Sequence, residues 1–145
     1  MTRHADWEAR LNAALEKHRD LAGAWGFSDC WVMEQDAYFA VTGEKLLPHL
    51  SGYKTERGGY KLFAKSGFVT VEQALESVLP SVPPLMAQRG DLAVIEREGV
   101  LSCGVVTAIG VAVKTIYGDA ETQIISHAAL EYHPITKIKS AFRVN

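Results

Sequence analysis

Cys30 is the residue whose type and position could most readily do chemistry. It follows the short apolar turn 24–29, in which Ser28 or Asp29 can cap a helix, and it precedes the helix predicted over Trp31–Thr42. The first backbone N–H groups of a helix have no intrahelical partner, so they favour a thiolate and can serve as an oxyanion hole. A thiol in such a place can ionise below the pKa of about 8.5 of a free cysteine. The alternative is that Cys30 is a small buried apolar residue.

A second group of candidate residues lies in the segment from Gly52 to Lys61. Tyr53, Arg57 and Tyr60 form an aromatic and basic mixture that could bind a glycan or a partner protein, because tyrosine and arginine are enriched at interface hot spots. The glycines of the same segment can also simply make turns, and the tyrosines would then only cover the neighbouring helices. Both interpretations are open from the sequence.

Three helical patterns are expected to position these residues. Apolar residues at intervals of three and four, together with capping residues, predict helices at Trp7–Ala22, Trp31–Thr42 and Val71–Leu79. Asp6 is the expected cap of the first helix, and Thr70 and Gln73 form a capping box for the third. The glycine-rich stretch Glu44–Phe68 is expected to be an ordered surface connection with little regular structure.

The chain changes character after Arg89-Gly90-Asp91, where β-branched residues punctuated by glycine predict strands. The predicted strands are Leu92–Arg97, Val100–Ile109, Val111–Tyr117, Thr122–Ser126 and Ile138–Val144. Helices first and strands second indicate an α+β fold, with N-terminal helices packed on one side of a C-terminal antiparallel β-sheet. We therefore expect one domain over 1–145, made of an N-terminal helix (1–23), a helical half with Cys30 (24–80) and a β half (90–145).

Composition excludes several classes of protein. The chain has 145 residues, 48% of them hydrophobic, and fifteen basic against seventeen acidic residues give a net charge of -2 without any long charge run. No nucleic-acid or anionic-membrane surface is indicated. Apolar stretches fall short of the ~20 residues of a membrane span, and the start lacks the apolar stretch of a secretory signal, so synthesis in the cytoplasm is expected. The two cysteines make neither a disulfide framework nor a zinc motif, and no cofactor is expected.

Two short motifs follow each other along the chain. Trp25–Cys30 comes before a predicted helix, and Arg89–Val94 comes at the start of the predicted sheet. Together they resemble the NlpC-type papain-like cysteine peptidases, which carry an Asp-Cys pair and a later Gly-Asp strand. More narrowly, the chain resembles a phage and prophage tail-protein family related to those peptidases. That family shows, in this order, the counterparts of Asp29-Cys30, Asp36, Thr42-Gly43, Gly90-Asp91 and Ala141–Val144. The resemblance implies a papain-like, NlpC-type fold.

The same resemblance implies a histidine base on the strand after the Gly-Asp strand. This chain has Leu101-Ser102-Cys103-Gly104-Val105 there, so Ser102 occupies the expected histidine position. A neutral hydroxyl with a high pKa cannot take a proton from a thiol at neutral pH, and the expected catalytic pair is therefore absent. The neighbouring Cys103 could react or pair with Cys30, although a glycine-flanked cysteine in an apolar strand is more often part of the core.

His127 is the replacement base that the sequence offers. It follows the predicted strand Thr122–Ser126 and could reach across the sheet toward Cys30; the alternative is a strand-end histidine in solvent. The other histidines belong to the first helix or to expected turns, and none has metal-ligand spacing: His4, His18, His49 and His133. Asp36, six residues after Cys30, is expected to point away from it and to accept hydrogen bonds from a neighbouring loop.

The resemblance leaves two main classes of function open. In the first, the chain is a structural component of a phage tail tip or baseplate, catalytically degenerate because Ser102 stands at the base position. In the second, it is a cysteine peptidase or amidase that cleaves peptidoglycan, with Cys30 as nucleophile and His127 or a partner's residue as base. A third alternative is a small binding domain unrelated to phage. The first class implies a virion tail location, with other tail-tip and baseplate proteins bound at the 52–61 loop or at a sheet edge near Ile138–Val144.

Overall fold

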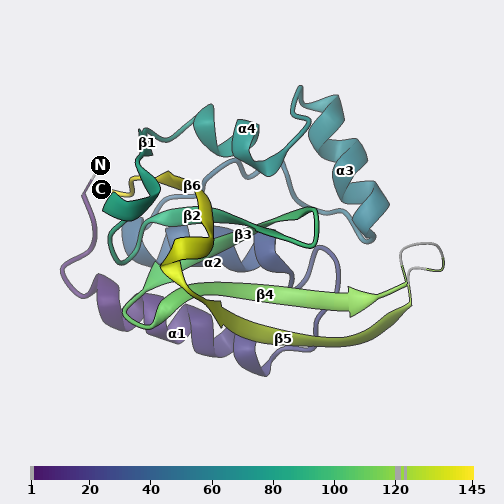
Figure 1. The fold of residues 1–145 in the computed structure, drawn as a ribbon, viewed down its shortest axis with the longest axis horizontal. Coiled ribbons are helices and arrows are strands. Elements are labelled where there is room, and N and C mark those ends of the chain that lie inside the picture. The colour runs from purple at the N-terminus through teal and green to yellow at the C-terminus, as the bar shows by residue number, and fades with distance from the viewer. Residues whose placement is uncertain (1, 120–121, 123) are drawn as a thin grey trace.

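The computed structural model describes residues 2–119, 122 and 124–145. Helices come first along the chain and the main sheet second, which confirms the predicted α+β class (Figure 1). The helices are α1 (Trp7–Asp20), α2 (Cys30–Thr42), α3 (Glu56–Lys65) and α4 (Val71–Glu76). The strands are β1 (Ser81–Val82), β2 (Leu92–Arg97), β3 (Val100–Thr107), β4 (Gly110–Gly118), β5 (Ile125–His133) and β6 (Ile138–Phe142). Short 3-10 turns cover Pro84–Met86 and Ile135–Lys137. None of the described helices is long and apolar enough to span a bilayer.

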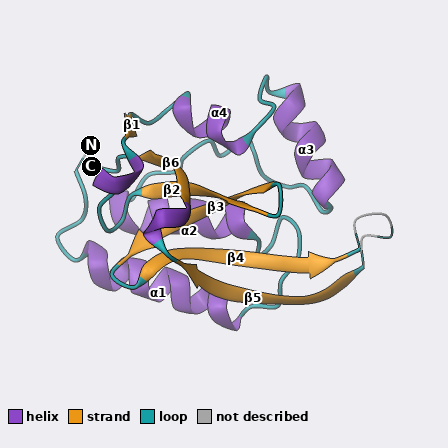
Figure 2. Ribbon diagram, viewed as in Figure 1, coloured by secondary structure: helices purple, strands orange, loops and turns teal. Residues whose placement is uncertain are grey.

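The strands form one six-stranded antiparallel sheet in the order β1-β6-β2-β3-β4-β5 (Figure 2). The prediction that the segment Ile138–Val144 forms an exposed sheet edge is wrong, because β6 lies between β2 and β1. The proline-rich segment before the sheet supplies the covering strand: Ser81 pairs with Phe142, and Arg143 donates its backbone N–H to the carbonyl oxygen of Pro80. The edges of the described sheet are therefore β1 and β5.

β3 and β4 pair over a short length only. Their register runs from Val105 opposite Ala112 to Thr107 opposite Gly110, whereas the rest of β3 pairs only with β2 and the rest of β4 pairs only with β5. The two strands thus separate beyond the hairpin, as Figure 2 shows. This opening in the sheet faces the start of α2 and is where the candidate site lies.

α1 begins behind Asp6 as predicted, but the Asp6 side chain makes no capping hydrogen bond and instead accepts one from Arg10 Nε at 2.8 Å. The helix ends at Asp20, slightly before the predicted end. Near this end the buried ammonium of Lys114, on β4, donates hydrogen bonds to the carbonyl oxygens of His18 and Leu21. A cation at the carboxyl end of a helix satisfies carbonyl groups that have no partner in the helix itself.

α3 is the main difference from the predicted helices, since it lies inside the stretch 44–68 that was expected to be irregular. Thr55 caps it, with Oγ1 accepting from the Gly58 N–H at 2.9 Å. Gly58 and Gly59 predicted turns, but they lie in the helix and allow close packing: a Cβ on Gly59 would stand 3.3 Å from the ring of Tyr53. Tertiary packing has therefore overridden a weak helix propensity.

The strand prediction is good for β2, whose bounds are those expected, and poor for β5. Of the predicted strand Thr122–Ser126, Gln123 lies outside the described residues, and only Ile125 and Ser126 belong to β5. β5 continues to His133, which was expected in a turn, because it pairs with β4 as far as Val111. Strand formation there follows from cross-strand pairing more than from the local sequence.

Candidate functional site

The structure confirms that Cys30 is the first residue of a helix, and the cap of that helix is fixed from several sides. The Asp29 carboxylate accepts from the Val32 N–H at 2.8 Å through Oδ1. Its Oδ2 accepts from the Gly26 N–H at 2.9 Å and from the Tyr53 hydroxyl at 2.7 Å. The entry turn, the start of α2 and the segment before α3 therefore meet at one carboxylate, which orients the beginning of the helix.

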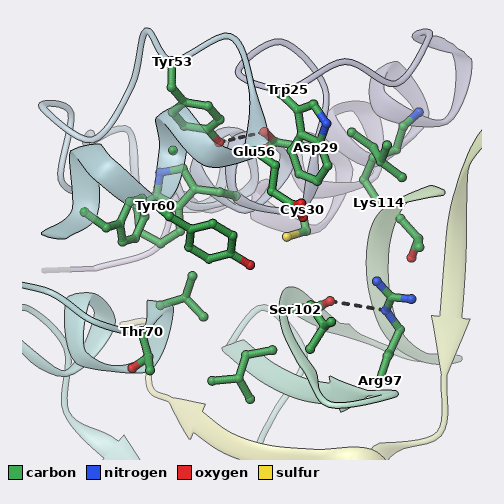
Figure 3. A pocket seen from close by; sticks show the side chains of 18 of the residues that line it. Trp25, Asp29, Cys30, Tyr53, Glu56, Tyr60, Thr70, Arg97, Ser102 and Lys114 are labelled. Atoms are coloured by element: carbon green, nitrogen blue, oxygen red, sulfur yellow. Dashed lines mark hydrogen bonds between the residues drawn. The ribbon is translucent and has the colours of Figure 1, made fainter. Parts of the chain in front are cut away.

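The Cys30 side chain is half-buried and its sulfur points into a cavity of about 200 Å³ between the helices and the opening in the sheet (Figure 3). The α3 side contributes Glu56, Gly59, Tyr60 and Phe63; the sheet contributes Arg97, Val100, Leu101, Ser102, Lys114, Thr115 and Ile116. The walls thus combine aromatic and aliphatic surface with a few polar groups, which is the composition of small-ligand and peptide sites.

Cys103, expected to be core, lies behind Cys30 on β3 and is fully buried. Both are free thiols, and each shifts the pKa of the other. Interaction with Cys103 lowers the pKa of Cys30, against the opposing effects of burial and the Asp29 charge, and the positive charge of Arg97 adds a smaller lowering. Interaction with Cys30, together with burial, raises the pKa of Cys103 well above its usual value. The pair is therefore asymmetric: Cys30 is the thiol that ionises first, and Cys103 remains protonated.

Glu34 is a site residue that the sequence reasoning missed. It lies one helical turn after Cys30 on α2, is fully buried, and neither carboxyl oxygen has a hydrogen bond of ordinary geometry to the described residues. Burial raises its pKa well above the usual value, and a negative charge on Cys30 raises it further, while the nearby Gly104 N–H and Cys103 thiol oppose this. The available signal was an acidic residue at i+4 from Cys30, which places it on the same face of the helix.

Ser102, at the position where the resemblance implies a histidine, is buried and lines the cavity. Its Oγ accepts a hydrogen bond from Arg97 Nε at 3.3 Å (Figure 3). The hydroxyl is therefore paired with a permanent cation, and it has no function as a base. Among the described residues that line the cavity there is no histidine.

His127 is placed away from Cys30. It is exposed on β5, its ring stacks on that of Tyr117 with 4.4 Å between centroids, and it is not part of the cavity lining. Its cross-strand partner is the same Tyr117, so the ring is held on the surface of the β4–β5 ribbon. The structure thus does not bring the suggested base and the nucleophile together.

The three binding candidates are separated by the fold. Tyr53 lines the cavity and donates a hydrogen bond to Asp29. Tyr60 also lines the cavity, with 57% of its surface exposed. Arg57 is exposed on α3 and is not part of the lining. The segment therefore contributes to the cavity wall through its tyrosines, as Figure 3 shows.

A second constellation has the residue types of a serine hydrolase but no access to substrate. His18 Nδ1 lies 2.8 Å from Ser28 Oγ, and His18 Nε2 lies 2.6 Å from Asp36 Oδ2. Ser28 and His18 are both fully buried and neither lines the Cys30 cavity. Asp36 thus contacts α1, where Lys17 also reaches it, rather than a loop as expected. These contacts fasten α1 to α2 and to the turn before Cys30.

Fold and site together define an α+β domain with a cysteine at the start of a helix that lines a cavity, and a second, buried cysteine on β3. In the described residues no cluster of three or more His, Cys, Asp or Glu could hold a metal ion. A family model described as "Domain of unknown function (DUF6950)" matches residues 2–144, and the chain belongs to that family. No curated protein and no solved structure matched the chain.

Proposed function

We propose that the chain is a structural component of a phage tail tip or baseplate, with a papain-like, NlpC-type fold whose hydrolytic site has degenerated. Support for the fold comes from a cysteine at the start of a helix that packs against an antiparallel sheet, followed along the chain by the Gly90-Asp91 strand. The observation that carries the loss of hydrolysis is the absence of histidine from the described lining of the Cys30 cavity, with Ser102 paired to Arg97 instead.

Arg97, Lys114 and Glu34 do not replace the missing base. A hydrolytic base must take the proton of the thiol and return it to the leaving amine, so it must face the substrate. The guanidinium of Arg97 has N–H donors and no acceptor, so it cannot take a proton. Lys114 is occupied with the carbonyl groups near the end of α1, and Glu34 is buried behind the thiols, outside the cavity lining. Cys30 is therefore a thiol in a binding site whose described lining offers no histidine for the proton transfer that hydrolysis requires.

The cavity is suited to an extended peptide. A second hollow shares Trp25, Glu56, Val100 and Ile116 with it and continues along the β4–β5 ribbon to Ile124 and Ile125. Together they make a groove with aromatic and aliphatic walls, lined also by the carboxylates of Asp29, Glu56 and Asp119. In a tail tip, this groove would receive a segment of a neighbouring tail protein or a peptide of the cell wall.

Two measurements test this proposal. Purified chain incubated with peptidoglycan should release no new amino termini, and Cys30→Ala should give the same trace as the native chain. Release by the native chain that disappears in Cys30→Ala would overturn the degenerate site. Mass spectrometry of purified tails should detect the chain; intact virions that lack it would overturn the structural role.

An active cysteine peptidase or amidase is the second candidate, favoured by the lowered pKa of Cys30 at the start of α2. If this candidate is correct with His127 as base, His127→Ala should abolish cell-wall cleavage while Ser102→Ala should leave it. Equal activity in His127→Ala and the native chain would remove His127 from that mechanism.

A further inference from the structure

We propose that Arg97 and Ser102 form a subsite of the Cys30 cavity that binds a carboxylate group of the peptide held in the groove. This subsite deepens the proposed function and rests on it, because the groove must receive a peptide. It specifies the chemical group by which that peptide is recognised and the two side chains that recognise it.

Arg97 is the last residue of β2, and its guanidinium points into the cavity that Cys30 also lines (Figure 3). Two contacts hold it in this position. Its Nε donates to Ser102 Oγ at 3.3 Å, and its Cζ lies 5.8 Å from the centre of the Tyr117 ring. These contacts leave the two terminal amino groups without a hydrogen-bond partner among the described residues. The guanidinium is therefore oriented before a ligand arrives.

The positive charge of Arg97 is not neutralised within the described part of the chain. Arg3, Arg10, Arg89 and Arg143 each form an ion pair with a carboxylate, whereas Arg97 forms none with the described residues. Its side chain is half-buried among the aromatic and aliphatic walls of the cavity. A cation that has lost part of its hydration is stabilised by an anion that hydrogen-bonds to it, so the site favours an anionic ligand.

Ser102 supplies a second donor. Its Oγ accepts from Arg97, so the hydroxyl proton can still be donated, and it has no acceptor among the described residues. The residue lines the cavity although only 3% of its surface is exposed. A carboxylate in front of Arg97 can accept from the guanidinium through both oxygens and also from this hydroxyl. The position at which the resemblance implies a base therefore offers a donor to an anion.

The charges of the cavity favour a carboxylate over a phosphate. Lys114, the other cation of the described lining, already donates to carbonyl groups near the end of α1. The carboxylates of Asp29 and Glu56 line the same cavity and repel further negative charge. One guanidinium matches one carboxylate in charge and in its paired donor geometry. The ligand is therefore expected to present a single carboxylate to the end of β2.

The test uses Cys30 of the full chain as a reporter, alkylated either by iodoacetate or by iodoacetamide. The two reagents share the reacting carbon and the leaving group, and they differ in carrying a carboxylate or a neutral amide. Mass spectrometry gives the two rate constants at Cys30. Their ratio in the native chain should favour iodoacetate about tenfold more than the ratio for glutathione, since one reagent gains a hydrogen bond to a charged group. A ratio equal to that of glutathione would overturn the proposal.

Arg97→Gln should bring the ratio down to that of glutathione, and Ser102→Ala should lower it in part. A change in the ionisation of Cys30 affects both reagents alike and cancels in the ratio. Arg57→Gln is the matched control, because Arg57 is exposed on α3 and outside the lining. A native ratio in Arg97→Gln, or an equal loss in Arg57→Gln, would overturn the role of Arg97.

Arg97→Lys separates paired hydrogen bonds from charge alone. A lysine keeps the positive charge but not the planar pair of donors, so the variant should retain only part of the preference for iodoacetate. Full retention would overturn the assignment of paired hydrogen bonds to the guanidinium.

The source of the carboxylate is distinguished by the protection of Cys30 from iodoacetamide. Protection by trialanine but not by trialanine amide would assign the subsite to the carboxyl terminus of a peptide. Protection by acetyl-Ala-Glu-Ala amide but not by its glutamine counterpart would assign it to an acidic side chain. If the two acids protect no better than their amide counterparts, the proposal fails. The tail role is tested separately, because absence of the chain from virions leaves these rates unchanged.

Discussion

The phenol of Tyr53 donates a 2.7 Å hydrogen bond to Oδ2 of Asp29, the residue that caps α2 next to Cys30. Burial and the negative charge of Asp29 raise the pKa of Tyr53 far above its usual value, so the phenol stays protonated and remains a donor. The segment that leads to α3 is thereby attached to the start of the helix that carries the thiol.

Tyr53→Phe should lower the free energy of unfolding by about 2 kcal/mol, because a hydrogen bond to a charged acceptor is lost and Asp29 keeps its charge. Urea unfolding followed by circular dichroism measures the change. Tyr60→Phe is the matched control, since the Tyr60 ring is 57% exposed and the substitution should leave the midpoint within error. Equal losses in both variants would show that the Tyr53–Asp29 bond contributes nothing particular.

Glu34 should make the stability of the native chain fall as pH rises. Its raised pKa means that, above the usual value of about 4.3, the folded state still holds a proton that the unfolded state has lost. Stability is therefore lost from that pH upward, until the folded state also releases its proton. Glu34→Gln removes this dependence. Between pH 5 and pH 8, the free energy of unfolding of the variant should therefore rise relative to that of the native chain.

The measurement is urea unfolding of both chains at several pH values, reported as the difference between them so that other titrating groups cancel. Glu76→Gln, at an exposed position, is the control for the removal of one carboxylate. A difference between Glu34→Gln and the native chain that shrinks with rising pH would contradict the burial of an ionisable Glu34.

Asp91 should be among the most costly residues to change. Its fully buried carboxylate accepts from Arg3 and the Val144 N–H through Oδ1, and from Arg143 and the Gln88 N–H through Oδ2. Asp91→Asn should lower the free energy of unfolding by about 3 kcal/mol, because two cations lose their counter-charge.

Asp6→Asn is the control for Asp91→Asn, since Asp6 pairs with Arg10 on the exposed surface of α1 and should have no measurable effect. Thermal unfolding of the two variants under the same conditions measures the difference in their melting temperatures. A melting temperature of Asp91→Asn equal to that of Asp6→Asn would show that the cluster is not a determinant of stability.

Ser28 should be unreactive despite its contact with His18. A fluorophosphonate probe should not label the native chain, because Ser28 and His18 are fully buried. Ser28→Ala should instead lower the free energy of unfolding by about 1–3 kcal/mol, the cost of leaving a buried polar partner unpaired. Labelling of the native chain that is absent in Ser28→Ala would identify a second, hydrolytic centre.

Local features of the sequence were sufficient for part of the fold. The bounds of β2 and the capped starts of α2 and α4 follow from residues that are close together in the chain, so they could be predicted. α3 could not, because Gly58 and Gly59 indicate turns unless the packing of the Tyr53 ring is known. Most of β5 could not, because its pairing with β4 determines it.

The candidate site shows the same limit. Cys30 was identified because capping is a local property, whereas the effect of Cys103 on its pKa depends on how β3 packs against α2. His127 was expected just after a strand, but it lies within β5, which continues to His133 and holds it outside the cavity lining. Glu34 had a usable signal in its spacing from Cys30, yet its burial follows only from the packing of α2 on the sheet.

The two ends of the described chain lie side by side (Figure 1), and Arg3 joins them: its Nε donates to the carbonyl oxygen of Val144 at 2.8 Å. Tension applied to the two ends would therefore break this hydrogen bond first and the contacts of Asp91 after it, one at a time. Hydrogen bonds that break in sequence resist force poorly compared with bonds loaded in parallel. A load passing through this domain would have to enter across the faces of its sheet and helices, and not through its ends.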